Sequence, residues 1–267
     1  MKYPDGTWLT GLITLSIYVW LRDRTWWGAA EDVLPILAAL PLMVWLGHPW
    51  KFREIGKSSP KIRYLIIAAI LLVCGALFDL CLPAALAWIA VFWCWMEHRI
   101  EPEGHLRIGR LLPLALLAFP WVTLDLQPVG WWFRLSSAIT VENLFSWIGF
   151  SVTRTGVQLL VQGLPISVDA ACSGLKALQS LLIAGVTLTF VMVGNSPRYW
   201  MNLPLLFLLA WLANTARILS ICVAAMTWGS DFALGVFHAW GGLAVLSVMF
   251  GLCWGLLHFQ QTHPSKS

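Results

Sequence analysis

The chain has 267 residues, of which 59% are hydrophobic and only 11% are charged, and its formal net charge is +4. Soluble globular domains contain about 25% charged residues, so this composition excludes a large soluble protein and indicates an integral membrane protein. The basic residues form no stripe with interleaved aromatic residues, so we expect no nucleic-acid partner and expect membrane lipid as the counter-charge.

Apolar windows predict an all-α fold, a polytopic membrane helical bundle of about eight transmembrane helices. A helix needs about 20 apolar residues to cross roughly 30 Å of hydrocarbon, and several windows reach that length while others fall slightly short. The predicted spans are 7–22, 33–49, 64–80, 82–96, 111–126, 172–193, 200–226 and 236–258. The first window lacks a small-residue cleavage site followed by a polar mature domain, which favours a retained helix over a signal peptide.

Basic residues in short loops predict the orientation of the helices, because lysine and arginine are held on the cytoplasmic side during insertion. Such residues follow the second and fourth predicted spans, as Lys51, Arg53, Lys57, Lys61, Arg63, Arg99, Arg107 and Arg110. Both loops and both chain ends are therefore expected in the cytoplasm. We expect a multi-pass protein of the inner (plasma) membrane whose active site faces the periplasm or exterior.

The chain is expected to form one integral membrane domain (1–267), with N-terminal helices (1–126) and a catalytic core (127–267). Residues 127–170 are predicted to be an external loop, and a loop of that length usually carries function or its own structure. The apolar spacing over 144–161 predicts an amphipathic helix on the outer leaflet, followed by a strand-like segment at 165–168. This loop leads directly into a cysteine motif.

Cysteine usage separates one thiol from the rest. The six cysteines form no CxxC pair and no ladder of metal-ligand spacing, so neither a metal nor another cofactor is expected. Within apolar spans a cysteine behaves as a small hydrophobe, which is the interpretation of Cys74, Cys94, Cys222 and Cys253. Cys81 lies near a predicted external turn. Cys172 alone has polar neighbours.

The polar surroundings of Cys172 favour a nucleophile. If a turn near Asp169 caps the sixth span, the free backbone N–H groups and the helix dipole favour the thiolate form of Cys172. Ser173 and Gly174 keep the surroundings small, so that a substrate carbonyl can approach. Lys176 lies one turn deeper on the same face, where it either adds positive field or extends to the outer headgroups.

Arg217 lies inside an apolar span, and an arginine there is a functional-site hypothesis unless it only bonds the carbonyls of a neighbouring broken helix. Asn214 precedes it by three residues, so the amide is expected to orient the guanidinium. His238 opens the last span on the same predicted external side. A lone histidine is usually structural, but three spans that bring Cys172, Arg217 and His238 to similar depth favour a shared site.

These motifs resemble those of the exosortase/archaeosortase family of membrane cysteine transpeptidase-like sorting enzymes. The resemblance rests on Ala171-Cys172-Ser173-Gly174, then Asn214-x-x-Arg217-Ile218, then His238, and it covers the chain from about Gly130 onward. It implies catalytic roles for Cys172, Arg217 and His238. The supporting residues are Asn214, Ser173, Gly174 and Lys176.

The resemblance also implies the activity. Family members are thought to recognise a C-terminal sorting signal, which is a motif such as Pro-Glu-Pro, a transmembrane helix and a basic cluster. They cleave at the motif and transfer the new C-terminus to an acceptor, and bacterial members often accompany exopolysaccharide genes. The expected partners are the sorting-signal helix of exported proteins and an acceptor nucleophile of unknown kind. Glu97, Glu101 and Glu103 are candidate docking residues for the basic cluster.

Two alternatives remain open from the sequence. A juxtamembrane cysteine protease would use the same residues with water as the acceptor. A non-enzymatic transport or assembly subunit of an exopolysaccharide system would use Arg217 as an ion or substrate contact, and would retain function when Cys172 is replaced by serine.

Overall fold

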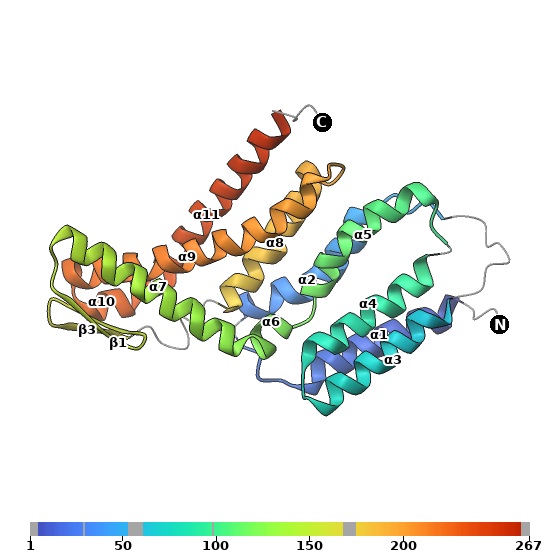
Figure 1. The fold of residues 1–267 in the computed structure, drawn as a ribbon, viewed down its shortest axis with the longest axis horizontal. Helices are drawn as coiled ribbons and strands as arrows, with labels where there is room; N and C mark the ends of the chain where they lie inside the picture. Colours follow the sequence, from blue (N-terminus) through green and yellow to red (C-terminus); the bar gives the residue numbers. More distant parts are fainter. Residues whose placement is uncertain (1–4, 29, 53–60, 98, 168–174, 263–267) are drawn as a thin grey trace. The chain divides into compact units, whose positions relative to one another are not determined.

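A computed structural model describes residues 5–28, 30–52, 61–97, 99–167 and 175–262, and 80% of these described residues are helical (Figure 1). In chain order the elements are α1 (Asp5–Arg22), α2 (Ala30–Gly47), α3 (Ile62–Leu77), α4 (Cys81–Met96), α5 (Pro102–Leu117), α6 (Trp121–Asp125), α7 (Gln127–Ile148), β1 (Val152–Thr155), β2 (Gln158–Val161), β3 (Leu164–Ser167), α8 (Leu175–Val193), α9 (Arg198–Trp228), α10 (Ser230–Leu234) and α11 (Val236–Thr262). The prediction of an all-α fold is therefore confirmed for the helices, but it did not include one small sheet.

Two helices of the described chain are both long enough and apolar enough to cross a membrane. They are Arg198–Trp228 and Trp240–Thr262, and four shorter apolar helices accompany them, Val33–Gly47, Ile62–Leu77, Cys81–Met96 and Leu178–Val193. Each predicted window overlaps a helix, but the count of about eight spans is not confirmed. The fifth window is interrupted, because Pro120 disfavours helical backbone in the residue before it and separates α5 from α6.

The residues pack into two compact units. The first contains residues 1–125 and 189–199, and the second contains residues 126–188 and 200–267. The first unit therefore holds α1 to α6 with the turn between α8 and α9, and the second holds α7, the sheet and most of α8 to α11.

Tertiary hydrogen bonds to backbone carbonyls hold the first unit together. The indole of Trp88 on α4 donates to Leu12 O on α1 at 3.0 Å. The guanidinium of Arg22, at the end of α1, donates to Leu80 O and Gly75 O at 2.8 Å each, and so holds the turn between α3 and α4. Leu12 lies in the middle of α1, whereas Gly75 lies in the last turn of α3 and Leu80 just before α4, so these bonds join the helices along their length and at the turn.

A carboxylate from α6 caps α4. No side chain near the start of α4 caps that helix, but Asp125 accepts hydrogen bonds from Cys81 N at 2.9 Å and Leu82 N at 2.5 Å. The negative charge of Asp125 also lies next to the positive N-terminal end of the α4 dipole, which is a favourable interaction. The cap therefore fixes α6 against α4.

The turn between α8 and α9 belongs to the first unit because Arg110 and Tyr199 join it to α5. The Arg110 guanidinium donates to Gly194 O, and the fully buried Tyr199 donates its hydroxyl proton to Arg110 O. Arg110 of α5 thus bonds the turn, and Tyr199, at the start of α9, bonds α5.

The stretch after α6 differs from the predicted external loop. It begins with the 22-residue α7, which ends at Gly149 with φ +95° in the left-handed region. Three antiparallel strands in the order β1-β2-β3 follow, so the amphipathic helix predicted for 144–161 is wrong beyond residue 148. The predicted strand at 165–168 is observed as β3 over its described residues.

Positive backbone φ angles explain the sheet. Gly156 at φ +63° forms the turn between β1 and β2, and Gln162 and Gly163, at +50° and +81°, form the turn between β2 and β3. Two consecutive residues with positive φ are the requirement of a type I′ hairpin. β2 alternates exposed and buried residues, and its buried Leu159 and Val161 face the helices.

The sheet and the helices of the second unit share one apolar cluster. It joins α7, β2, α9 and α10 through Ala138, Val141, Phe145, Leu159, Val161, Ile218, Ile221, Cys222, Ala224, Ala225 and Ala233. α8 packs on α9 where Gly185 faces Leu206, since a Cβ at Gly185 would lie 2.6 Å from Leu206 Cδ2. α9 and α11 meet in a reciprocal amide pair, Asn202 with Gln260, with both hydrogen bonds at 2.9 Å.

Replacing Asp125 with alanine should destabilise the first unit by about 2 kcal/mol, because two backbone N–H groups lose a charged acceptor. Thermal unfolding of the purified protein in detergent measures the change. Asp231→Ala, which removes an exposed carboxylate from α10, is the control and should leave the melting temperature nearly unchanged. Equal melting temperatures for Asp125→Ala and wild type would show that the cap is dispensable.

Candidate active site

A polar contact joins α7 to α9 beside the predicted site. Asn214 donates its Nδ2 to the Ser137 hydroxyl at 3.3 Å, and the hydroxyl oxygens of Thr215 and Ser137 lie 2.9 Å apart. Thr215 is also 2.9 Å from Trp211 O, one turn earlier in α9. Asn214 donates to Ser137, the Ser137 hydroxyl can donate to Thr215, and the Thr215 hydroxyl can then donate to the Trp211 carbonyl. Each hydroxyl proton is used once in this order, so each of these buried groups has a hydrogen-bond partner.

The hydrogen bond of Asn214 therefore runs to α7. The sequence predicted that this amide orients the guanidinium of Arg217, and that role stays a prediction. What the amide does is hold α9 at a fixed rotation on α7, because Ser137 and Asn214 are both buried and each needs the other. Since Arg217 is less than one turn further along the same helix, its direction follows from that rotation.

The guanidinium of Arg217 lies on α11. Its Nε is buried, and a Cβ added to Gly242 would lie 3.2 Å from Nε, 3.4 Å from Cζ and 3.5 Å from Nη2. A side chain at this position would press on the guanidinium, so glycine favours the close approach of Arg217 to the α11 backbone. The contact joins α9 to α11 at Arg217, the charge that the sequence places inside an apolar span.

Two further predicted residues are placed by their backbone. α11 begins at Val236, as the last predicted window expected, so His238 lies in its first turn and four residues before Gly242. Residues four apart in a helix lie on the same face. Lys176 lies in the first turn of α8. The side chains of His238 and Lys176 lie outside the described part of the structure.

Cys172, Ser173 and Gly174 also lie outside the described residues. The nearest described neighbour in the chain is Leu175, the first residue of α8, which is almost fully buried. Leu175 packs on α7, because a Cβ at Gly130 would lie 2.8 Å from Leu175 Cδ1. The residue that follows the cysteine motif thus packs on α7, the helix that also accepts a hydrogen bond from Asn214.

Five described cysteines have free thiols, namely Cys74, Cys81, Cys94, Cys222 and Cys253. Burial of Cys94, Cys222 and Cys253 agrees with the prediction that they act as small hydrophobes, whereas Cys74 is only partly buried. Cys81 is buried as well. The described residues contain no group of three or more histidine, cysteine or acidic side chains that could hold a metal ion.

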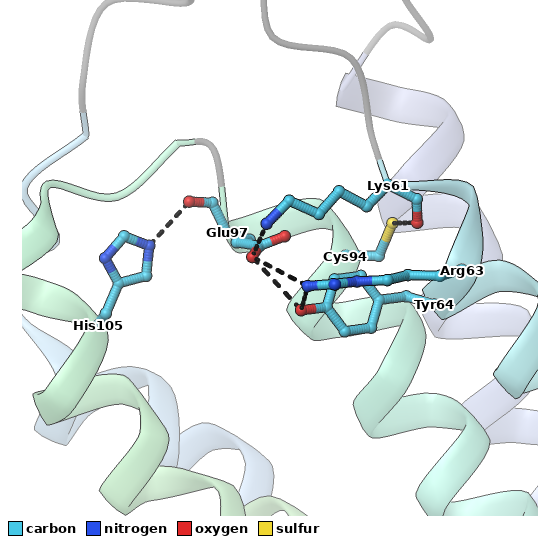
Figure 2. A network of polar contacts seen from close by, with 6 residues as sticks. All are labelled: Lys61, Arg63, Tyr64, Cys94, Glu97 and His105. Atoms are coloured by element: carbon cyan, nitrogen blue, oxygen red, sulfur yellow. Dashed lines mark hydrogen bonds and ion pairs between the residues drawn. The ribbon is translucent and has the colours of Figure 1, made fainter.

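A separate polar network surrounds Glu97, one of the three predicted docking residues (Figure 2). Its Oε1 accepts from Lys61 Nζ at 2.6 Å and from the Tyr64 hydroxyl at 3.3 Å, and Arg63 lies 4.0 Å away. The carbonyl of Glu97 accepts from His105 Nε2 at 2.8 Å. The network joins the start of α3, the end of α4 and α5.

These contacts hold Glu97 in its charged form. Partial burial raises the pKa of Glu97, but the hydrogen bond and charge of Lys61, the Tyr64 hydroxyl and the charge of Arg63 together outweigh it, so the pKa lies below its ordinary value. A cation on a substrate would compete with Lys61 for Oε1 of this carboxylate, whose Oε2 is buried. Docking at Glu101 and Glu103 stays a prediction.

Sequence reasoning missed the partners of the motif residues. Ser137 and Gly130 lie in the stretch that was predicted to be a loop, and Gly242 carried no signal of its own in the sequence. The signal of the first two was weak but present, since Gly130, Ser137 and Ala138 are small residues at helical spacing, which allow helices to approach closely.

The family model described as transmembrane exosortase (Exosortase_EpsH) matches residues 9–255. The chain belongs to this family. It is therefore a membrane protein of a sorting-enzyme family, and the match includes the N-terminal helices that the sequence motifs left generic. Comparison with curated proteins and with solved structures gave no match.

Replacing Gly242 with leucine should lower sorting activity by about 10²-fold, because the new side chain must displace the Arg217 guanidinium, and displacements of about 1 Å can cost that much. Activity is measured as processing of exported proteins in cells, at equal membrane levels of the two chains. Gly251→Leu, in the same helix, is the matched control, since a Cβ there meets nothing within 4 Å. Full activity of Gly242→Leu would mean that the position of Arg217 is unimportant.

Proposed function

We propose that this exosortase-family member is a cysteine transpeptidase that cleaves C-terminal sorting signals of exported proteins at the outer face of the inner membrane. Cys172 is the nucleophile, Arg217 and His238 complete the catalytic set, and the new C-terminus passes to an acceptor. Family membership supports a sorting enzyme in general.

One observation carries the assignment of the site. The guanidinium of Arg217 lies against Gly242, and His238 is one helical turn before that glycine in α11. The Arg217 motif thus contacts the helix that carries His238, about one turn from that residue, which supports a shared site. α7 links this contact to the third motif, because it binds Asn214 through Ser137 and Leu175 through Gly130.

The first half-reaction breaks a peptide bond. The Cys172 thiolate attacks the carbonyl carbon, a C–S bond forms, and the oxygen becomes an oxyanion that the Arg217 guanidinium stabilises. The imidazolium of His238 donates its proton to the departing amine as the C–N bond breaks. The products are a thioester on Cys172 and a released tail that carries the transmembrane helix.

The second half-reaction transfers the acyl group. Neutral His238 removes a proton from the acceptor, the acceptor attacks the thioester, and the thiolate of Cys172 leaves. Ser173 and Gly174 leave room for the approach, and Lys176 adds positive field near the thiolate. With an amine, lipid or glycan as acceptor the enzyme is a transferase, and with water it is a protease.

Cys172→Ala should abolish processing, because the thioester cannot form. C-terminal peptide mass spectrometry of membrane proteins compares cells that carry the wild-type chain with cells that carry the variant. A set of exported proteins should retain its hydrophobic tail helix only in the variant, and a product joined to an amine or lipid would distinguish transfer from hydrolysis.

The same experiment separates the non-enzymatic alternative. If no C-terminus changes although Cys172→Ala and Cys172→Ser are present at normal levels, the cysteine chemistry is wrong. Retained function of Cys172→Ser would then favour a transport or assembly subunit.

His238→Ala should leave a trace of activity where Cys172→Ala leaves none, since a general acid contributes about 10²–10⁴-fold. Rates of tail release from one processed protein, followed by pulse–chase labelling, measure the difference. Identical residual rates in the two variants would contradict the division of roles between nucleophile and acid.

A further inference from the structure

The buried face of α7 contains one charged residue. Gly130, Ser137, Ala138, Val141 and Phe145 are all buried and recur at helical spacing, so they form a single stripe along the helix. Arg134 falls on this stripe, one turn after Gly130 and less than one turn before Ser137. It is half-buried, and its Nε is fully buried.

Ser137, the other polar residue of this stripe, has partners on α9, whereas the buried Nε of Arg134 has none among the described residues. Ser137 bonds Asn214 and Thr215, and the acid of α7, Glu142, bonds Arg154 Nε at 2.7 Å. Within the described residues, the buried Nε of Arg134 has no hydrogen bond. A guanidinium nitrogen that is removed from water and left without an acceptor costs free energy, so this Nε indicates a place where an external anion can bind.

The neighbours of Arg134 define where that anion would lie. On one side, Gly130 contacts Leu175, which follows Cys172 by three residues. On the other side, Ser137 contacts Asn214, which precedes Arg217 by three residues. Arg134 is therefore on the stretch of α7 between the points where two catalytic motifs are attached.

The opposite face of α7 is the exposed one. Trp132 points there and is 62% exposed, whereas Trp131, three residues before Arg134, lies at the edge of the buried stripe and is 42% exposed. A lipid headgroup would approach α7 from this exposed face, whereas Arg134 lies on the face that packs against α8 and α9. The position of Arg134 thus favours a group that enters the site over a group of the surrounding membrane.

We propose that Arg134 binds an acidic side chain of the polypeptide substrate next to the bond that is cleaved, and that it determines substrate specificity. A guanidinium presents two parallel N–H donors that fit a carboxylate, and an amide of the same size cannot replace that charge. The inference rests on the proposed function, because it takes the ligand to be the peptide that Cys172 attacks.

The test uses an exported reporter fused to the tail that wild-type cells process most completely. In one variant tail, each acidic residue within five positions of the processing site is changed to its amide, and in another it is changed to lysine. The wild-type chain should process the acidic tail at least tenfold faster than the amide tail. Arg134→Gln should process both at one low rate, and Arg134→Glu should prefer the lysine tail.

Several results would overturn the proposal. Wild-type chain that does not distinguish acidic from amide tails, or Arg134→Gln that still does, would show that Arg134 does not read the substrate. Loss of all processing in Cys172→Ala with unchanged tail preference in Arg134→Gln rejects this inference and leaves the proposed function standing. Processing that continues in Cys172→Ala, or that is missing from the wild type, rejects both.

Two controls exclude a structural role. Arg24→Gln removes an exposed arginine from the turn after α1 and should change neither rate nor preference. Arg134→Lys keeps the charge and should keep a reduced preference for the acidic tail. If Asp169→Asn has the same effects as Arg134→Gln on both tails, the acceptor is this chain's own carboxylate and the proposal is wrong.

Discussion

The hydroxyl of Ser137 is the contact on which the second unit depends. It is buried between α7 and α9 and bonds both Asn214 and Thr215, so neither helix can rotate without leaving polar groups unsatisfied in an apolar interior. The apolar cluster that carries the sheet is built on the same two helices. The rotation of α9 on α7 that Ser137 fixes therefore affects the position of the sheet and the direction of Arg217.

Close packing and chemistry use the same small residues. Gly130 admits Leu175 at the start of α8, and Gly242 admits the guanidinium of Arg217. Glycine lets side chains of one helix reach the backbone of another, which brings helices that carry different motifs within reach of one substrate. In this unit, small residues that have no chemistry of their own position the residues that the sequence predicted to be functional.

The helices could be predicted because apolar windows report burial and length directly. The sheet could not, because Leu144, Trp147 and Ile148 continue at helical spacing into Val152, although Gly149 ends the helix between them. Arg217 could be identified as an isolated charge in an apolar span. Ser137 and Gly242 could not, because a hydroxyl and a glycine acquire their roles only from partners about 80 and 25 residues away along the chain.

The paired amides of Asn202 and Gln260 help to hold α9 and α11 together. About 22 Å of α9 separates Asn202 from Arg217, and the two residues contact α11 at Gln260 and Gly242. The two helices are thus joined at two heights, and the distance between these heights is roughly three quarters of the thickness of a bilayer's hydrocarbon core. Any motion that separates α9 from α11 along their whole length must therefore break both the amide pair and the contact of the guanidinium with Gly242.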